Sequence, residues 1–144
     1  MLTILLVINS VIFIGLSGIH FYWLMGGKWG LSMSLPYNPS TQDFLFKPSA
    51  LSTLGVAIGL LLFALITIGN AFDFPFGIEL RYLRWGDLVI SFIFLIRAIG
   101  DFKYIGFFKC IRETPFGKND SKFYTPLCLI ISIIGFLIFR IATN

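Results

Sequence analysis

The side chains that could do chemistry in this sequence are few, and the clearest of them lie inside or beside long apolar stretches. An ionised side chain at the centre of a membrane-spanning helix costs at least about 2.5 kcal/mol, so a charge there needs a partner or a function. Arg97 is the deepest such charge, and Asp101 follows four residues later, on the same face of a continuous helix. We expect an ion pair between them that either locks the helices together or holds a ligand.

His20 is the only histidine of the chain, and an aromatic run that includes Trp23 follows it. Imidazole gives and takes a proton near neutral pH, which makes His20 the best acid–base candidate, although such a residue can also serve only as an interfacial hydrogen-bonding group. If the first and third apolar stretches are neighbours, His20 converges with Arg97 and Asp101. A guanidinium, a carboxylate and an imidazole with aromatic walls suit an amphiphile with an anionic or polar head. The predicted ligand-binding residues are His20, Trp23, Arg97, Asp101, Lys103 and Tyr104.

A second charge, Asp87, lies two residues after Trp85. We expect it near the outer interface of the membrane, as an interfacial or first-turn carboxylate that meets water or Arg84, and a functional role is the alternative. Beyond these residues the sequence assigns neither a catalytic residue nor a cofactor. Cys110 and Cys128 lie far apart and there is no second histidine, so we expect no metal site.

The composition indicates a protein that is surrounded by lipid. Of 144 residues, 57% are hydrophobic and only 12% are charged, which is more apolar surface than one soluble core could bury. A bilayer core about 30 Å thick needs about 20 helical residues for each crossing. Four stretches of this kind occupy residues 2–25, 50–70, 85–103 and 125–141. We predict an all-α, four-helix transmembrane bundle that forms a single integral membrane domain over residues 1–144.

The segments between these stretches carry turn formers and aromatic residues. The first stretch begins without the Lys or Arg of a secretory signal, and we expect it to be retained. Residues 26–49 and 101–124 combine aromatic and basic residues, which predicts loops that lie along the membrane surface. Pro48 and Ser49 predict a helix start. Gly55 and Gly59 predict close packing against a neighbouring helix of the same chain, and a homo-oligomer is the alternative.

The distribution of basic residues predicts the orientation of the chain. Four crossings place both termini on one side, so the two sets of loops can be compared for Lys and Arg. The first and third loops carry Lys28, Lys47, Lys103, Lys109, Arg112, Lys118 and Lys122, whereas the other side has Arg81, Arg84 and Arg140. We therefore predict that the first and third loops of this cell-membrane protein are cytoplasmic and that both termini lie outside the cell. Because the basic residues flank apolar spans, we expect the lipid bilayer as the partner and no nucleic acid.

Two sequence blocks resemble a known protein family. The blocks are HFYWLMGGKWGLSMSLP at residues 20–36 and RAIGDFKYIGFFKCIRETPFGKNDSKFYTPLCL at residues 97–129. They resemble the signature blocks of a bacterial family of small four-span membrane proteins, which is known only as a domain of unknown function. The resemblance implies a bacterial cytoplasmic membrane. It implies no activity.

Three classes of function fit these observations. The first is a membrane protein that binds or transports a lipid-like or aromatic amphiphile in a cleft on the cytoplasmic side, with Arg97 on its polar head. The second is an enzyme that acts on an isoprenoid- or quinone-like substrate, with His20 as the acid–base group. The third is a structural or accessory membrane subunit, in which the polar residues only specify the packing of the bundle.

Overall fold

The structure is a computed structural model that describes residues 1–41, 43–71 and 79–143, and the described part is helical. Within these residues, four long helices carry the fold, and three short helical segments lie between them. In chain order the elements are α1 (Leu2–Leu24), α2 (Leu31–Ser34), α3 (Ala50–Gly69), α4 (Leu80–Ile99), α5 (Pro115–Asn119), the π-helical segment η1 (Asp120–Tyr124) and α6 (Thr125–Thr143). The predicted all-α helical bundle is confirmed.

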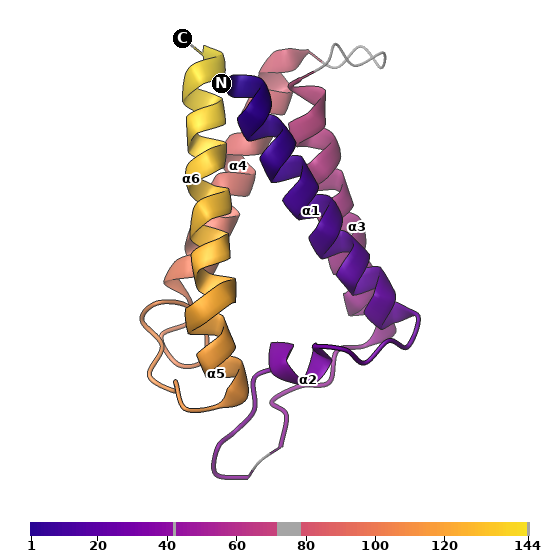
Figure 1. Cartoon of the computed structure of the whole chain (residues 1–144), viewed down its shortest axis with the longest axis vertical. Coiled ribbons are helices and arrows are strands. Elements are labelled where there is room, and N and C mark those ends of the chain that lie inside the picture. The colour runs from indigo at the N-terminus through magenta and orange to yellow at the C-terminus, as the bar shows by residue number, and fades with distance from the viewer. Residues whose placement is uncertain (42, 72–78, 144) are drawn as a thin grey trace.

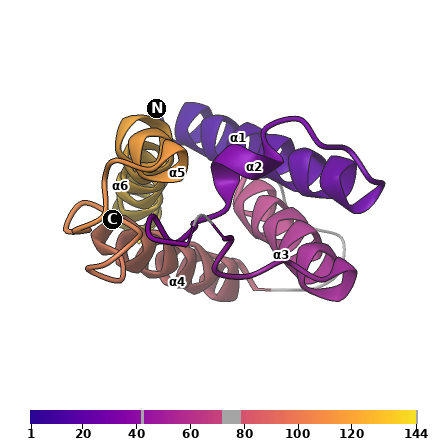
Figure 2. The same ribbon diagram turned by 90° about the horizontal axis from the view of Figure 1, so that it is seen from below.

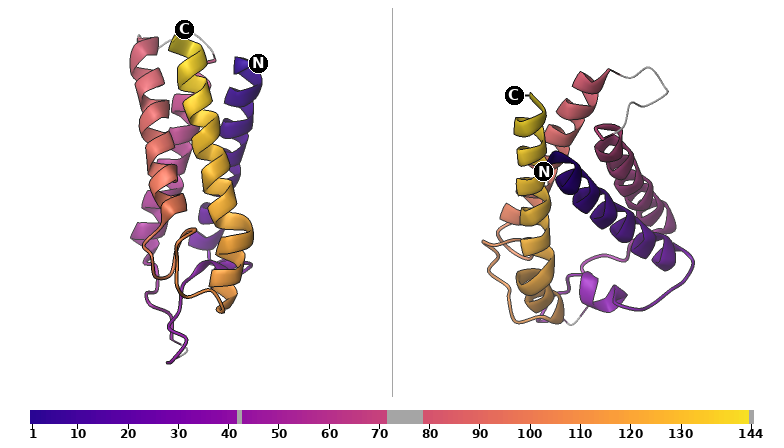
Figure 3. Two further views of the ribbon diagram at one scale, coloured as in Figure 1. Left: turned by 90° about the vertical axis from the view of Figure 1, so that its left-hand side faces the viewer. Right: turned by 45° about the horizontal axis from the view of Figure 1, so that its top comes forward.

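The long helices form two pairs. α1 packs along α3, and α4 packs along α6. The pairs approach each other at the end that holds both termini and separate toward the end that holds α2 and α5 (Figure 1). Seen from that second end, α2 lies between the two pairs (Figure 2). The side view places the N- and C-termini at the same end of the four long helices (Figure 3).

The core lies where the two pairs meet. The Phe13 ring of α1 is fully buried and lies 5.9 Å from the Phe63 ring of α3 and 5.5 Å from the Phe94 ring of α4. α6 adds Ile131, which is also fully buried. Close packing of these large side chains holds the two helix pairs together.

Local sequence explains where two of the helices begin. Ser49 caps α3, because its side chain accepts a hydrogen bond from Ser52 N at 3.1 Å, as the Pro48–Ser49 pair predicts. Thr114 caps α5 in the same way, with Gly117 N at 2.9 Å, and Pro115 occupies the first turn. α5, η1 and α6 follow one another without a break, so this long helix starts ten residues before the predicted stretch 125–141.

The third long helix is also displaced from its prediction. α4 covers residues 80–99 and not 85–103, so it includes the charged turn with Arg81 and Arg84 and ends before Asp101. A helix needs backbone hydrogen bonds and not apolar side chains, so it can extend past the apolar stretch into its charged flank. At the other end, Gly100 has a φ of 90°, which stops the helix.

Three helices of the described chain are long and apolar enough to cross a membrane: Leu2–Leu24, Ala50–Gly69 and Pro115–Thr143. The fourth long helix, α4, is of similar length but carries more charge. One packing prediction is wrong. Added Cβ atoms at Gly55 and Gly59 would meet no described atom within 4 Å, so these glycines do not mediate close packing within the chain.

Candidate functional site

The most highly connected polar group of the described structure is Asp120, the first residue of the π-helical segment. Its Oδ1 lies 2.9 Å from Arg97 Nη2, and its Oδ2 lies 2.9 Å from Lys109 Nζ. Gly106 N and Thr125 Oγ1 also donate to Oδ2, each at 2.9 Å. Asp120 is completely buried, and Arg97 and Lys109 compensate its charge. We call Arg97, Lys109 and Asp120 the charged cluster.

The backbone brings the members of this cluster together from three segments. Arg97 lies in the last turn of α4, Lys109 lies in the following loop, and Asp120 lies where α5 passes into η1. π-helical turns change the direction of side chains within a helix and are frequent at functional sites. Here the turn brings Thr125 Oγ1 within 2.9 Å of Asp120 Oδ2, although the two residues are five positions apart.

A close approach of two glycines shapes the loop that carries Lys109. Gly100 and Gly106 both have a φ of 90°. A Cβ atom on Gly106 would collide with Ile99 O and with the backbone of Gly100, so only glycine fits. This contact folds the loop back on the end of α4 and points Gly106 N and Lys109 at Asp120.

Asp101 has a different role from the predicted one. Its Oδ1 accepts hydrogen bonds from Lys103 N, Tyr104 N and Ile105 N at 2.9, 2.7 and 2.9 Å. The expected Arg97–Asp101 ion pair is wrong, because Arg97 pairs with Asp120. Partial burial raises the pKa of Asp101, but the backbone N–H donors outweigh it and hold this pKa below its usual range. Asp101 is therefore a capping group of the loop.

Two more predicted site residues belong to the same loop. Lys103 and Tyr104 donate their backbone N–H groups to Asp101, and Lys103 Nζ lies 5.3 Å from the centre of the Tyr104 ring. The Lys103 side chain is exposed and the Tyr104 side chain is half-buried. Both residues thus lie on the same loop as Lys109 of the charged cluster.

His20 and Trp23 form a local group near the end of α1. His20 Nδ1 donates to Leu16 O at 2.8 Å, and the His20 and Trp23 rings meet edge to face with centres 5.0 Å apart. Trp23 Nε1 donates to Trp29 O at 2.9 Å and so ties the loop to the helix. In the described residues no hydrogen bond or ion pair joins His20 to Arg97 or Asp101. The predicted convergence of these three stays a prediction without a contact to support it.

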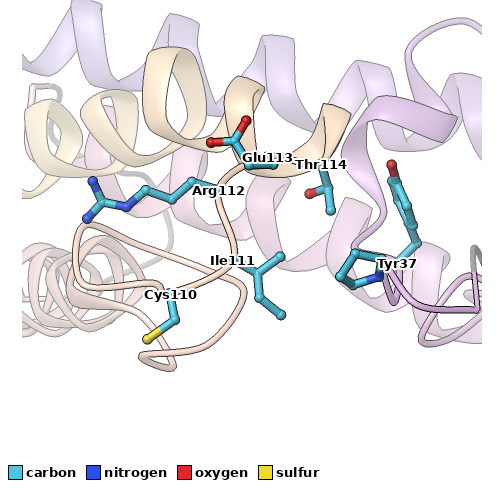
Figure 4. Close-up of a pocket in the computed structure, with 7 residues that line it drawn as sticks. Tyr37, Cys110, Ile111, Arg112, Glu113 and Thr114 are labelled. Carbon is cyan, nitrogen blue, oxygen red and sulfur yellow. The ribbon is translucent and has the colours of Figure 1, made fainter.

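Two pockets lie between the first and third loops. One, of about 390 Å³, is lined by Tyr37, Pro39 and residues 110–114. Its neighbour, of about 440 Å³, shares Tyr37 and includes Met33, Phe44 and Pro115. Figure 4 shows the Arg112 guanidinium directed away from Tyr37. Because Arg112 also donates to the backbone carbonyls of Phe107 and Lys109, it is engaged in holding the loop.

The predicted position of Asp87 is wrong. The sequence predicts a first-turn carboxylate near water, but the Asp87 side chain is 1% exposed and belongs to the second turn of α4. Thr67 Oγ1 and Asn70 Nδ2 of α3 donate to its two oxygens, each at 2.7 Å. The earlier start of α4 explains the change, since the helix begins seven residues before Asp87 and carries it into the bundle.

Sequence reasoning missed Lys109 and Asp120 as site residues. Lys109 looks like one more basic residue of an interfacial loop, and Asp120 lies in the polar run GKND, which has the composition of a solvated turn. One local signal existed. Thr114 and Pro115 form a capping pair that predicts a helix start and would have placed Asp120 in a helix.

The family model described as "Protein of unknown function (DUF3995)" matches residues 13–135. The chain belongs to this family. The match includes His20, Arg97 and Asp120, and it confirms the family resemblance expected from the two sequence blocks. No curated protein and no solved structure matches the chain.

Proposed function

We propose that this membrane protein binds the anionic head group of an amphiphile at Arg97, at the loop end of a bundle that crosses the bilayer four times. The observation that carries the proposal is an unsatisfied hydrogen-bond donor on the guanidinium group of Arg97. Arg97 Nη2 engages Asp120, whereas Nη1 is buried without a hydrogen-bond partner in the described structure. A guanidinium fits two oxygens of a carboxylate or phosphate side by side. Nη1 is closed to solvent, so an oxyanion beside Asp120 would have to displace neighbouring side chains to supply the missing acceptor.

The balance of charge supports an anion. Two cations and one carboxylate leave the charged cluster with one excess positive charge. Lys109 and Asp120 side chains are 1% and 0% exposed, but the Arg97 side chain is 32% exposed. Arg97 is therefore the member that a ligand can approach from outside, and its attraction for an anion is strengthened by the low dielectric of its surroundings.

The surroundings of the cluster support an amphiphile over a water-soluble anion. Phe102, Phe108 and Phe123 are more than half exposed at this end of the bundle. Exposed lysines stand beside two of them in the sequence, Lys103 beside Phe102 and Lys122 beside Phe123, and Lys122 Nζ lies 5.1 Å from the centre of the Phe123 ring. Aromatic rings and cations in this arrangement favour the head-group region of a bilayer. An acyl chain or another apolar tail would then lie along the lipid-facing helices.

We propose that the loop end faces the cytoplasm of a bacterial cell and that both termini face outside. The native cysteines allow a test, because Cys110 of the third loop is exposed and Cys128 is buried. A membrane-impermeant maleimide should label Cys110 in inside-out vesicles but not in intact cells, and Cys110→Ser should remove the signal. Labelling of Cys110 in intact cells would reverse the orientation.

Head-group binding is tested by thermal unfolding in detergent with added phosphatidylglycerol or phosphatidylcholine of the same acyl chains. We expect phosphatidylglycerol to raise the melting temperature of the wild type more than phosphatidylcholine does. Arg97→Gln should lose this difference, with an affinity at least about tenfold lower, because a hydrogen bond to a charged group contributes about 1.5–3 kcal/mol. Lys118→Gln, at an exposed position of the same end, is the matched control and should keep it.

If Arg97→Gln does not fold, native mass spectrometry of the wild type still tests head-group binding. Preferential retention of phosphatidylglycerol from an equimolar mixture supports the proposal. Equal retention of both lipids contradicts it. A tightly co-purifying protein without bound lipid contradicts it as well and favours an accessory subunit.

A further inference from the structure

Asp87 is a buried carboxyl group with hydrogen-bond donors but without a cation. Thr67 Oγ1 donates to Oδ1 and Asn70 Nδ2 donates to Oδ2, each at 2.7 Å. Asp87 is 1% exposed and Thr67 is fully buried. In the part of the chain that the structure describes, Asp87 forms no ion pair, whereas Asp120 has two. A carboxylate that is buried without a counter-charge is strongly disfavoured relative to the neutral acid.

Among the described residues, no cation of the neighbouring helices lies within ion-pair distance of this carboxyl group. α3, which supplies both donors, has no titratable side chain. The candidates on the other three long helices are Cys128 and Arg140 of α6, Arg81, Tyr82, Arg84 and Arg97 of α4, and His20, Tyr22 and the Met1 amine on α1. Arg97 is committed to Asp120 at the opposite end of α4.

We propose that Asp87 is a proton-binding site within the membrane-embedded part of the bundle, where its carboxyl group takes up and releases a proton. Thr67 suits both states of such a site. It donates to the carboxylate in the structure, and it can accept from the O–H of the neutral acid when its own hydroxyl turns to a backbone carbonyl of α3. Asn70 Nδ2 donates to Oδ2 in either state.

A second observation supports a proton at this site. Asn70 Oδ1 is buried and has no hydrogen-bond partner in the described structure. Together with the two oxygens of Asp87 it gives the site more acceptors than donors. One added hydrogen reduces this excess and neutralises the charge at the same time, so a proton is the ligand that the site needs.

The proposal is tested with dicyclohexylcarbodiimide, an apolar reagent that adds to protonated carboxylic acids and leaves a stable N-acylurea. Purified wild-type protein is treated at neutral pH, and peptides are mapped by mass spectrometry. We expect one main adduct on Asp87, none in Asp87→Asn, and none on the exposed Asp101. An adduct distribution that favours Asp101 over Asp87 would overturn the proposal.

Infrared spectroscopy gives a readout that does not depend on access of the reagent. Protein labelled with ¹³C-aspartate should show, at neutral pH, the C=O stretch of a protonated carboxylic acid, shifted by the isotope. Asn70→Leu should move this band to higher frequency, because the C=O of Asp87 loses its donor. If wild-type protein shows only carboxylate bands for its aspartates, Asp87 is ionised and the proposal fails. This outcome is independent of head-group binding at Arg97.

Discussion

Arg97 Nη2 and Asp120 Oδ1 lie 2.9 Å apart and join the last turn of α4 to the helix that leads into α6. The two residues are 23 positions apart in the sequence. Their contact ties the loop between these helices to both of them, because the same carboxylate also holds Lys109 and Gly106 N. The loop end of the α4–α6 pair is therefore built around one buried acid.

Replacement of Asp120 should strongly destabilise the folded protein. Asp120→Asn keeps the shape of the side chain but removes the charge that compensates Arg97 and Lys109. Loss of one partner of a buried ion pair costs about 3–5 kcal/mol, and we expect a corresponding fall in thermal stability in detergent. Glu113→Gln is the control, since the 3.8 Å pair of Glu113 with Lys118 is exposed, and it should change stability by less than about 0.5 kcal/mol. Equal effects of the two substitutions would show that Asp120 does not organise the loop.

The close approach of Gly100 and Gly106 gives a second prediction. In Gly106→Ala, the strained backbone conformation of the alanine should destabilise the protein by about 1–3 kcal/mol. The collision of its Cβ atom with the backbone of residues 99 and 100 should add to this loss. Gly55→Ala in α3 should be neutral or stabilising, since its Cβ meets no described atom within 4 Å. Thermal unfolding of the two variants side by side checks this, and a tolerated Gly106→Ala would contradict the described loop.

The capping role of Asp101 predicts a pH dependence. Its pKa is lower in the folded protein than in the unfolded chain, so the ionised carboxylate stabilises the fold. The contribution is fully present above the unfolded pKa of about 3.9 and is lost as the pH falls through the lower folded pKa. Asp101→Asn should therefore be less stable than the wild type at pH 7, and the two unfolding curves should converge in acid. A stability difference that does not change with pH would contradict the role of the charge.

The cap of α5 gives a fourth prediction. Thr114→Ala removes the acceptor for Gly117 N, and caps of this kind contribute about 1 kcal/mol. Because the cap starts the helix that carries Asp120, the loss should loosen the charged cluster as well. Hydrogen exchange of the amides of residues 117–120 should become faster in Thr114→Ala and stay slow in Thr114→Ser, which keeps the hydroxyl. Unchanged exchange in the alanine variant would show that the cap is not needed.

The sequence predicts the first two long helices well, because each is one apolar run and Ser49 caps the second. It predicts the other two less well for a physical reason. Hydropathy marks the part of a helix that lipid can surround, whereas helix ends follow from caps and breakers. Thr114 starts the last long helix inside a polar run, and Gly100 stops α4 before Asp101.

The same glycine explains why the partner of Arg97 could not be predicted. Spacing of four residues brings side chains together only on a continuous helix, and α4 ends between Arg97 and Asp101. The depth of Arg97 in an apolar stretch correctly indicates that it needs a carboxylate. Which carboxylate it finds depends on the turn at Gly106 and on the π-helical segment, and no local pattern connects these to position 97.

The measurement that tests head-group binding at Arg97 most directly is photo-crosslinking with an anionic phospholipid that carries the photoreactive group on its head. Wild-type protein is irradiated in lipid nanodiscs and the crosslinked peptides are mapped. Crosslinks should concentrate on residues 97–112 and 120–124 and should disappear in competition with unlabelled phosphatidylglycerol but not with phosphatidylcholine. Crosslinks that concentrate instead around Arg81, Arg84 and Arg140, the basic residues of the opposite end, would contradict the proposed site.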